Sequence, residues 1–71
     1  MAGREIFIEI VRYGDTVKVT AIDPDTGLEA VALGPASAAR ADLERIAVGK
    51  LERALEERRE APPRNRPGKL V

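Results

Sequence analysis

Residues Arg4 to Ile22, with the sequence REIFIEIVRYGDTVKVTAI, decide the fold of this chain. Polar and apolar residues alternate on both sides of Gly14-Asp15, as in strands that bury one face. A two-residue loop that contains glycine is typical of a tight β-hairpin. Such a loop places Ile10 opposite Val19, so the apolar faces of both strands coincide. The segment therefore predicts an antiparallel hairpin.

A third strand is predicted at Leu28–Leu33, after a turn formed by Asp23–Gly27. If all five turn residues are loop, Val31 and Leu33 join the core face. A four-residue loop would instead turn the two alanines of the strand inward. We prefer the five-residue loop, because it buries the larger side chains. The turn aspartates could ligate a cation, but turn chemistry explains them better, because the EF-hand pattern is missing.

A long helix is predicted from Ser37, which can cap it, to about Glu60, because Pro62 and Pro63 prevent its continuation. Its expected apolar side consists of Ala36, Ala39, Leu43, Ile46, Ala47, Leu51, Ala54 and Leu55. The predicted fold class is α+β: a three-stranded antiparallel meander followed by one C-terminal helix that packs on one sheet face (βββα). Residues 1–60 form a single domain in this prediction, and residues 61–71 form a flexible tail rich in proline and arginine.

The composition argues against an enzyme. The 71 residues include no cysteine and no histidine, which removes disulfides, thiolate metal sites and the commonest general base. The hydroxyl groups have explanations as caps, strand residues or turn residues, so no catalytic, cofactor-binding or metal-binding residue is expected. Lys50 falls in the apolar stripe of the helix. A stem that lies on apolar surface with its ammonium in water explains it better than catalysis does.

Charge is distributed unevenly along a chain whose formal net charge is zero. Residues 1–34 hold three basic and six acidic groups, whereas the tail carries only basic ones. The charged N-terminus lacks the apolar run of a secretory signal, and no stretch approaches the roughly 20 apolar residues of a membrane span. We therefore expect a cytoplasmic protein that does not enter a membrane.

The outer sheet face, opposite the predicted helix, is too apolar for a surface left wholly in water. Small chains bury only about 60% of their unfolded surface, so association would supplement a marginal core. We therefore expect a homodimeric protein–protein interaction module, or binding of an unidentified protein. Shielding of this face by strand twist and by the tail is the alternative. The candidate interface, on this face and on an apolar margin of the helix, comprises Phe7, Val11, Tyr13, Ile22, Leu28, Ala30, Ala32, Val48, Leu51 and Leu55.

Nucleic-acid binding is the alternative function, because a three-stranded sheet followed by a helix also occurs in proteins that place the sheet in a DNA groove. Its candidate contacts are Arg58, Arg59, Arg64, Arg66 and Lys69. The charge of the sheet argues against this function, because its outer face offers Glu5 and Glu9 with only Lys18 as a cation.

Four motifs stand out: the runs Val17–Asp23, Thr26–Ala30, Gly34–Ala36 and Lys50–Glu52. Together they resemble a small bacterial family of uncharacterised proteins of about 60–70 residues, a domain of unknown function, and the resemblance covers roughly residues 4–58. It implies a compact cytoplasmic domain with no assigned activity. Similar proteins are sometimes labelled serine hydroxymethyltransferase automatically. That label does not suit this chain, because such an enzyme needs a large cofactor-binding fold with a Schiff-base lysine.

Overall fold

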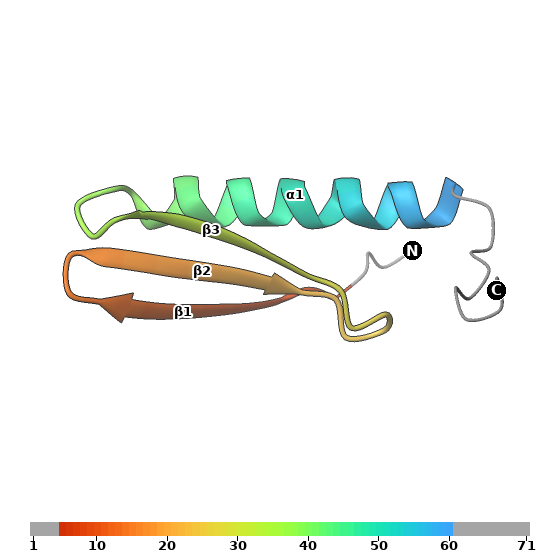
Figure 1. Ribbon diagram of the computed structural model, residues 1–71, viewed down its shortest axis with the longest axis horizontal. Helices are drawn as coiled ribbons and strands as arrows, with labels where there is room; N and C mark the ends of the chain where they lie inside the picture. The colour runs from red at the N-terminus through yellow and green to blue at the C-terminus, as the bar shows by residue number, and fades with distance from the viewer. Residues whose placement is uncertain (1–4, 61–71) are drawn as a thin grey trace, which may run out of the picture.

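The fold consists of one antiparallel sheet and one helix that lies along it (Figure 1). The computed structural model describes residues 5–60 of the chain. The elements are β1 (Phe7–Tyr13), β2 (Thr16–Ile22), β3 (Glu29–Pro35) and α1 (Arg40–Glu60), and the strands lie in the order β1-β2-β3. This arrangement confirms the predicted βββα fold.

The hairpin between β1 and β2 has the predicted register. Ile10 lies opposite Val19, and Tyr13 and Thr16 form the last pair before the two-residue turn. Gly14 has a φ of 61°, and Gly14 and Gly27 are the only described residues with a positive φ. A glycine at the first turn position is what a type II′ hairpin requires. The turn and the alternation of polarity therefore specify the same register.

The register between β2 and β3 differs from the prediction by one residue. The connection spans the six residues 23–28, and Ile22 pairs with Glu29. Val19 therefore lies opposite Ala32, and Ala21 lies opposite Ala30, so these small residues face the core. The prediction that Val31 and Leu33 are buried was wrong, because the extra loop residue turns both of them to the outer face.

Backbone and side-chain hydrogen bonds within the connection account for its length. The amide of Asp23 donates to the carbonyl of Leu28 (2.9 Å), and the amide of Gly27 donates to the carbonyl of Asp23 (2.8 Å). The hydroxyl of Thr26 donates to Oδ2 of Asp23 (2.7 Å) and accepts from the amide of Leu28 (3.1 Å). These contacts keep Leu28 in the loop, although the sequence analysis predicted it as the first residue of the third strand.

The core lies between α1 and the central part of the sheet. Leu43, Ala47 and Leu51 recur every four residues on α1, so they share one face of the helix. The buried apolar side chains of the core are Val19, Ala21, Ala32, Leu43, Ala47 and Leu51. Because half of these residues are alanine, the core is small, and α1 can pack closely on β3.

The N-cap of helix α1 lies two residues later than predicted. The carbonyl of Ala39 accepts from the amides of Asp42 (3.0 Å) and Leu43 (3.3 Å), which makes Ala39 the N-cap residue. The preceding segment is a turn, because the amide of Ala38 donates to the carbonyl of Pro35 (2.9 Å). The amide of Ala36 donates to the carbonyl of Asp15 (2.7 Å), which joins this turn to the β1–β2 hairpin. The prediction that Ser37 caps the helix was wrong. The helix runs to Glu60, the last residue that the structure describes.

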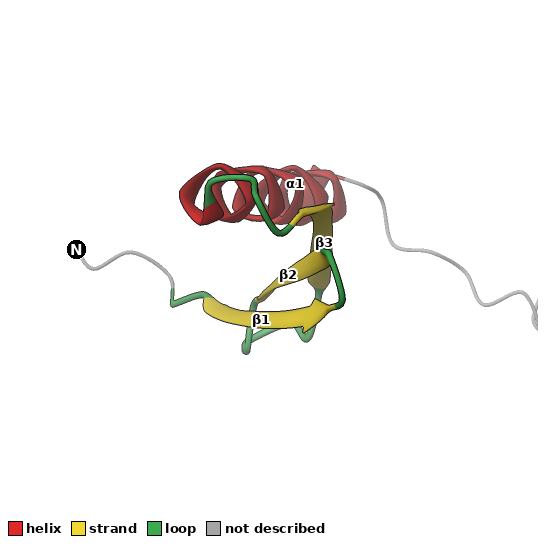
Figure 2. Cartoon of the chain, turned by 90° about the vertical axis from the view of Figure 1, so that its left-hand side faces the viewer, coloured by secondary structure: helices red, strands yellow, loops and turns green. Residues whose placement is uncertain are grey.

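Helix α1 covers β2 and β3 but leaves β1 to one side. In the end-on view, β3 rises beside the helix, whereas β1 is the strand farthest from it (Figure 2). One helix is about 10 Å wide, and three strands at about 4.8 Å spacing need about 14 Å of cover. A single helix is therefore too narrow to cover all three strands.

Candidate functional site

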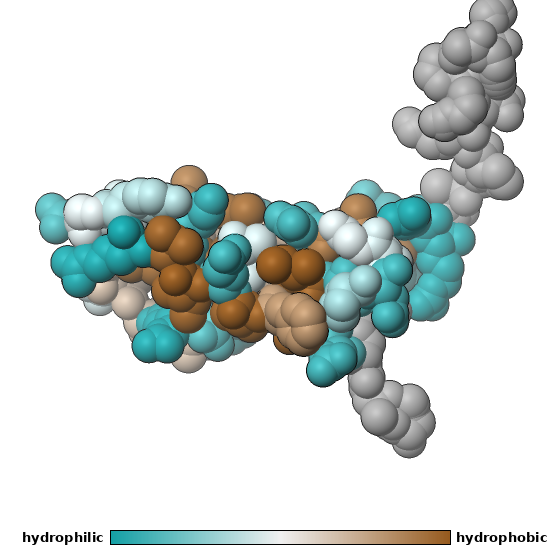
Figure 3. Space-filling model, turned by 90° about the horizontal axis from the view of Figure 1, so that it is seen from below, coloured by the Kyte–Doolittle hydropathy of each residue, from teal (hydrophilic) through white to brown (hydrophobic). Residues whose placement is uncertain are grey.

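Two exposed apolar surfaces remain after α1 has packed on the sheet. The first is the outer face, where the register gathers six apolar side chains: Phe7, Val11, Tyr13, Ile22, Val31 and Leu33. Seen from below, the side on which β1 lies in Figure 1, apolar side chains form a broken band across the middle of the molecule, with hydrophilic groups toward both ends (Figure 3). Such a band is larger than the scattered apolar residues of an ordinary surface.

The second apolar surface is the inner face of β1, which α1 does not cover. Ile8 and Ile10 point to the same side of the sheet as Val19 and Ala21, yet they are 37% and 38% exposed. The core residues opposite them on β2 are completely buried. The sequence prediction missed these two isoleucines, because it assumed that the helix covers the whole inner face.

As a result, β1 exposes large apolar side chains on both of its faces. Phe7 and Tyr13 on the outer face are 51% and 58% exposed, in addition to Ile8 and Ile10 on the inner face. Only Val11 is partly buried within the strand. An edge strand with two exposed apolar faces is a surface that normally has a partner.

The predicted interface residues divide into two groups. The structure places Phe7, Val11, Tyr13 and Ile22 on the outer face, as predicted. Two of the other candidates, Ala32 and Leu51, are buried in the core. The partly buried candidates that pack against the core are Leu28, Ala30, Val48 and Leu55. The predicted outer-face position of Ala30 and Ala32 was wrong, whereas the role of all these candidates in an interface stays a prediction. The physical reason for their burial is the β2–β3 register for the strand residues and the close packing of α1 for the helix residues.

The outer face carries few charges, and they are of both signs. Lys18 lies at its centre, with its ammonium 6.0 Å from the centroid of the Tyr13 ring, the limit of a cation–π contact. Glu9 and Glu29 lie on the same face, on the neighbouring strands. This distribution does not form a basic stripe.

The cations proposed for nucleic-acid contact lie elsewhere or outside the described residues. Arg58 and Arg59 are exposed in the last turn of α1, where they line a pocket of about 330 Å³ with Thr26 and Leu55. Because α1 packs on the inner face of the sheet, these arginines do not extend the surface around Lys18. The other candidates, Arg64, Arg66 and Lys69, lie outside residues 5–60.

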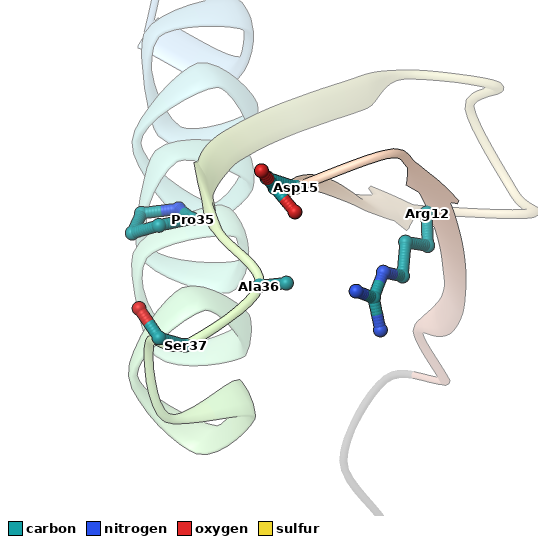
Figure 4. Close-up of a pocket in the computed structure, with 5 residues that line it drawn as sticks. All are labelled: Arg12, Asp15, Pro35, Ala36 and Ser37. Carbon is teal, nitrogen blue, oxygen red and sulfur yellow. The ribbon is translucent and has the colours of Figure 1, made fainter.

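A second pocket, of about 520 Å³, lies at the hairpin end of the sheet (Figure 4). Arg12 points toward Ala36, and its Nε donates to the carbonyl of Gly14 (2.7 Å). Asp15 and Ser37 also line the pocket, but the hydroxyl of Ser37 is directed away from the arginine. The lining therefore pairs no nucleophile with a base.

Lys50 lies at the edge of β3, where its ammonium donates to the carbonyl of Val31 (2.8 Å). The side chain is exposed, so its stem crosses the margin of α1 while its charged end reaches the strand.

Within residues 5–60, no group of three or more acidic, histidine or cysteine residues is arranged to hold a metal ion. No helix in that range is long and apolar enough to cross a membrane.

A small α+β domain with a half-covered sheet is the class of protein that this geometry defines. The chain belongs to the family described as a domain of unknown function, DUF6898, whose profile matches residues 3–59. The family assignment confirms the resemblance noted in the sequence, and its extent agrees closely with the predicted one. No curated protein and no solved structure matches the chain.

Proposed function

We propose that this chain is a non-enzymatic protein-interaction module that works as a homodimer. The observation that carries the proposal is the exposure of β1, which presents Phe7 and Tyr13 on one face and Ile8 and Ile10 on the other. Large apolar side chains exposed on both faces of one strand favour association, because a second chain that covers them removes them from water.

The size of the core supports the same proposal. Among its six buried apolar residues, only Val19, Leu43 and Leu51 are larger than alanine. A fully buried large side chain contributes about 1.5–3 kcal/mol, and conformational entropy opposes folding with a term of similar total size. Burial of the β1 side chains between two copies would add to this small core.

The proposal is tested by the molar mass of the chain in solution, measured by light scattering across a concentration series. We expect a mass of twice 7.7 kDa that falls toward 7.7 kDa on dilution. A mass of 7.7 kDa at every concentration would contradict the homodimer. The exposed β1 surface would then need a different protein as its partner.

The cytoplasmic location expected from the sequence remains a prediction. We add it to the proposal as the compartment in which to search for partners, by capture from the native cell.

A further inference from the structure

The two edges of the sheet differ in how they are protected. At β3, Lys50 places its ammonium on the carbonyl of Val31, and Pro35 ends the strand without an N–H group. Helix α1 also lies on this strand. A lysine, a proline and a covering helix are the devices by which proteins block pairing at a strand edge.

No such device protects β1 within residues 5–60. The strand contains no proline and lies away from α1, and its seven residues run from Phe7 to Tyr13 without a bulge in their pairing with β2. Its side chains include one acidic and one basic residue, Glu9 and Arg12, so its net charge is zero. An edge of this kind is a template for another strand.

We propose that β1 pairs with β1 of a second copy, antiparallel and centred on Ile10, to form a continuous six-stranded sheet. This inference rests on the proposed homodimer and specifies which surface forms it. A two-fold axis through the centre of the pairing makes the interface self-complementary, because each residue meets the same partner in both copies.

Charge and overlap select this register among the alternatives. With Ile10 opposite Ile10 of the second copy, all seven residues of β1 are paired, and Phe7 lies opposite Tyr13 of the second copy. Glu9 then lies opposite Val11, so no like charges oppose each other. Centring the pairing on Glu9 would place two carboxylates opposite each other, and centring it on Val11 would leave Phe7 without a partner.

The paired strands account for the exposed side chains on both faces of β1. On the outer face, two Phe7–Tyr13 pairs form between the copies, and aromatic cross-strand pairs stabilise sheets. On the inner face, Ile10 lies opposite Ile10 of the second copy, and Ile8 lies opposite Arg12 of the second copy, whose aliphatic stem can cover it. Sliding one strand along the other by one residue would place inner side chains opposite outer ones. Only displacements by an even number of residues therefore compete with this register, as the registers centred on Glu9 and on Val11 do.

Single cysteines test the register, because the natural chain contains none. Directly opposite residues of an antiparallel pair have Cα atoms about 4.5–5.5 Å apart, within the range that a disulfide spans. We expect Ile10→Cys to form a disulfide-linked dimer under mild oxidation. The matched control is Leu33→Cys, at the most exposed apolar position of the other edge strand (64%), which we expect to remain monomeric on a denaturing gel.

A second pair of variants tests the same contact through charge repulsion instead of disulfide formation. Ile10→Glu places two carboxylates opposite each other, so we expect the mass to fall from twice 7.7 kDa to 7.7 kDa. The control Leu33→Glu lies opposite Lys18 on β2 and should keep the dimer mass. Circular dichroism establishes that both variants are folded.

The outcomes separate this inference from the proposed function. A dimer that persists in Ile10→Glu and is cross-linked through Leu33→Cys instead of Ile10→Cys would overturn the β1 pairing. The homodimer would stand in that case, with the outer sheet face as its interface. A natural chain that is monomeric at every concentration would overturn both.

Discussion

At the scale of single residues, Gly34 determines how closely α1 approaches the sheet. A Cβ atom at this position would lie 2.7 Å from Cδ2 of Leu43, closer than side chains in proteins approach one another. Leu43 is buried, so its methyl groups have little room to move. The glycine therefore serves the packing of the helix and not a turn.

We predict that Gly34→Ala destabilises the protein by about 1–3 kcal/mol through overpacking, although alanine is the better residue for an ordinary strand. The free energy of unfolding from urea titrations measures this effect. Gly49→Ala is the matched control, because a Cβ there meets nothing within 4 Å. In the interior of a helix that change should stabilise by about 0.5–1 kcal/mol.

The double variant Gly34→Ala with Leu43→Ala tests whether contact with Leu43 causes the destabilisation by Gly34→Ala. Leu43→Ala alone should cost about 2–5 kcal/mol, as for other buried leucines. The new methyl at position 34 fits the space that the leucine vacates, so the two costs should not add. Additive costs would show that the clash with Leu43 is not the reason.

At the scale of elements, the N-terminus of α1 has an unfavourable cap. Ala39 occupies the N-cap, and its methyl group cannot accept a hydrogen bond from the first helical amides. The only hydroxyl nearby, that of Ser37, is too early in the chain to serve, because the turn at residues 36–38 comes before the helix. Asp42 in the first turn compensates in part through the helix dipole.

We predict that Ala39→Ser stabilises the protein by about 0.5–2 kcal/mol, because its hydroxyl can accept from an amide of the first turn. Thermal unfolding followed by circular dichroism measures the gain. Ala41→Ser, two residues later and also exposed, adds the same hydroxyl inside the helix and should be neutral or slightly destabilising. Equal effects of the two changes would contradict the role of position 39.

At the scale of the whole molecule, a sheet wider than its single helix leaves the fold incomplete. Helix α1 covers β2 and β3, and the apolar inner face of β1 remains exposed beside it. In the proposed dimer, the second copy supplies the missing neighbour for β1. Association then stabilises the fold, because the second copy binds the folded chain and not the unfolded one.

We predict that the midpoint of thermal unfolding rises with protein concentration. For a two-state dimer, a tenfold increase in concentration adds about 1.4 kcal/mol to the stability of the dimer. A folded unit of two such chains should then gain roughly 3–6 °C. Differential scanning calorimetry across the concentration series measures this shift, and a midpoint that does not depend on concentration would contradict coupled folding and association.

Much of the architecture follows from local pattern. The β1–β2 hairpin and its register were predictable, because the two-residue turn with Gly14 and the alternation of both strands agree. Phe7, Val11, Tyr13 and Ile22 were placed on the outer face for the same reason.

What the sequence alone determined is therefore the element order and one register, because short-range turn and strand preferences specify them. Only the tertiary structure decided the β2–β3 register, since hydrogen bonds inside the Asp23–Leu28 loop and the space under α1 select Ala30 and Ala32 over larger side chains. The exposure of Ile8 and Ile10 was likewise decided by tertiary structure. It depends on where a helix of about 10 Å width lies on a wider sheet, which no local pattern encodes.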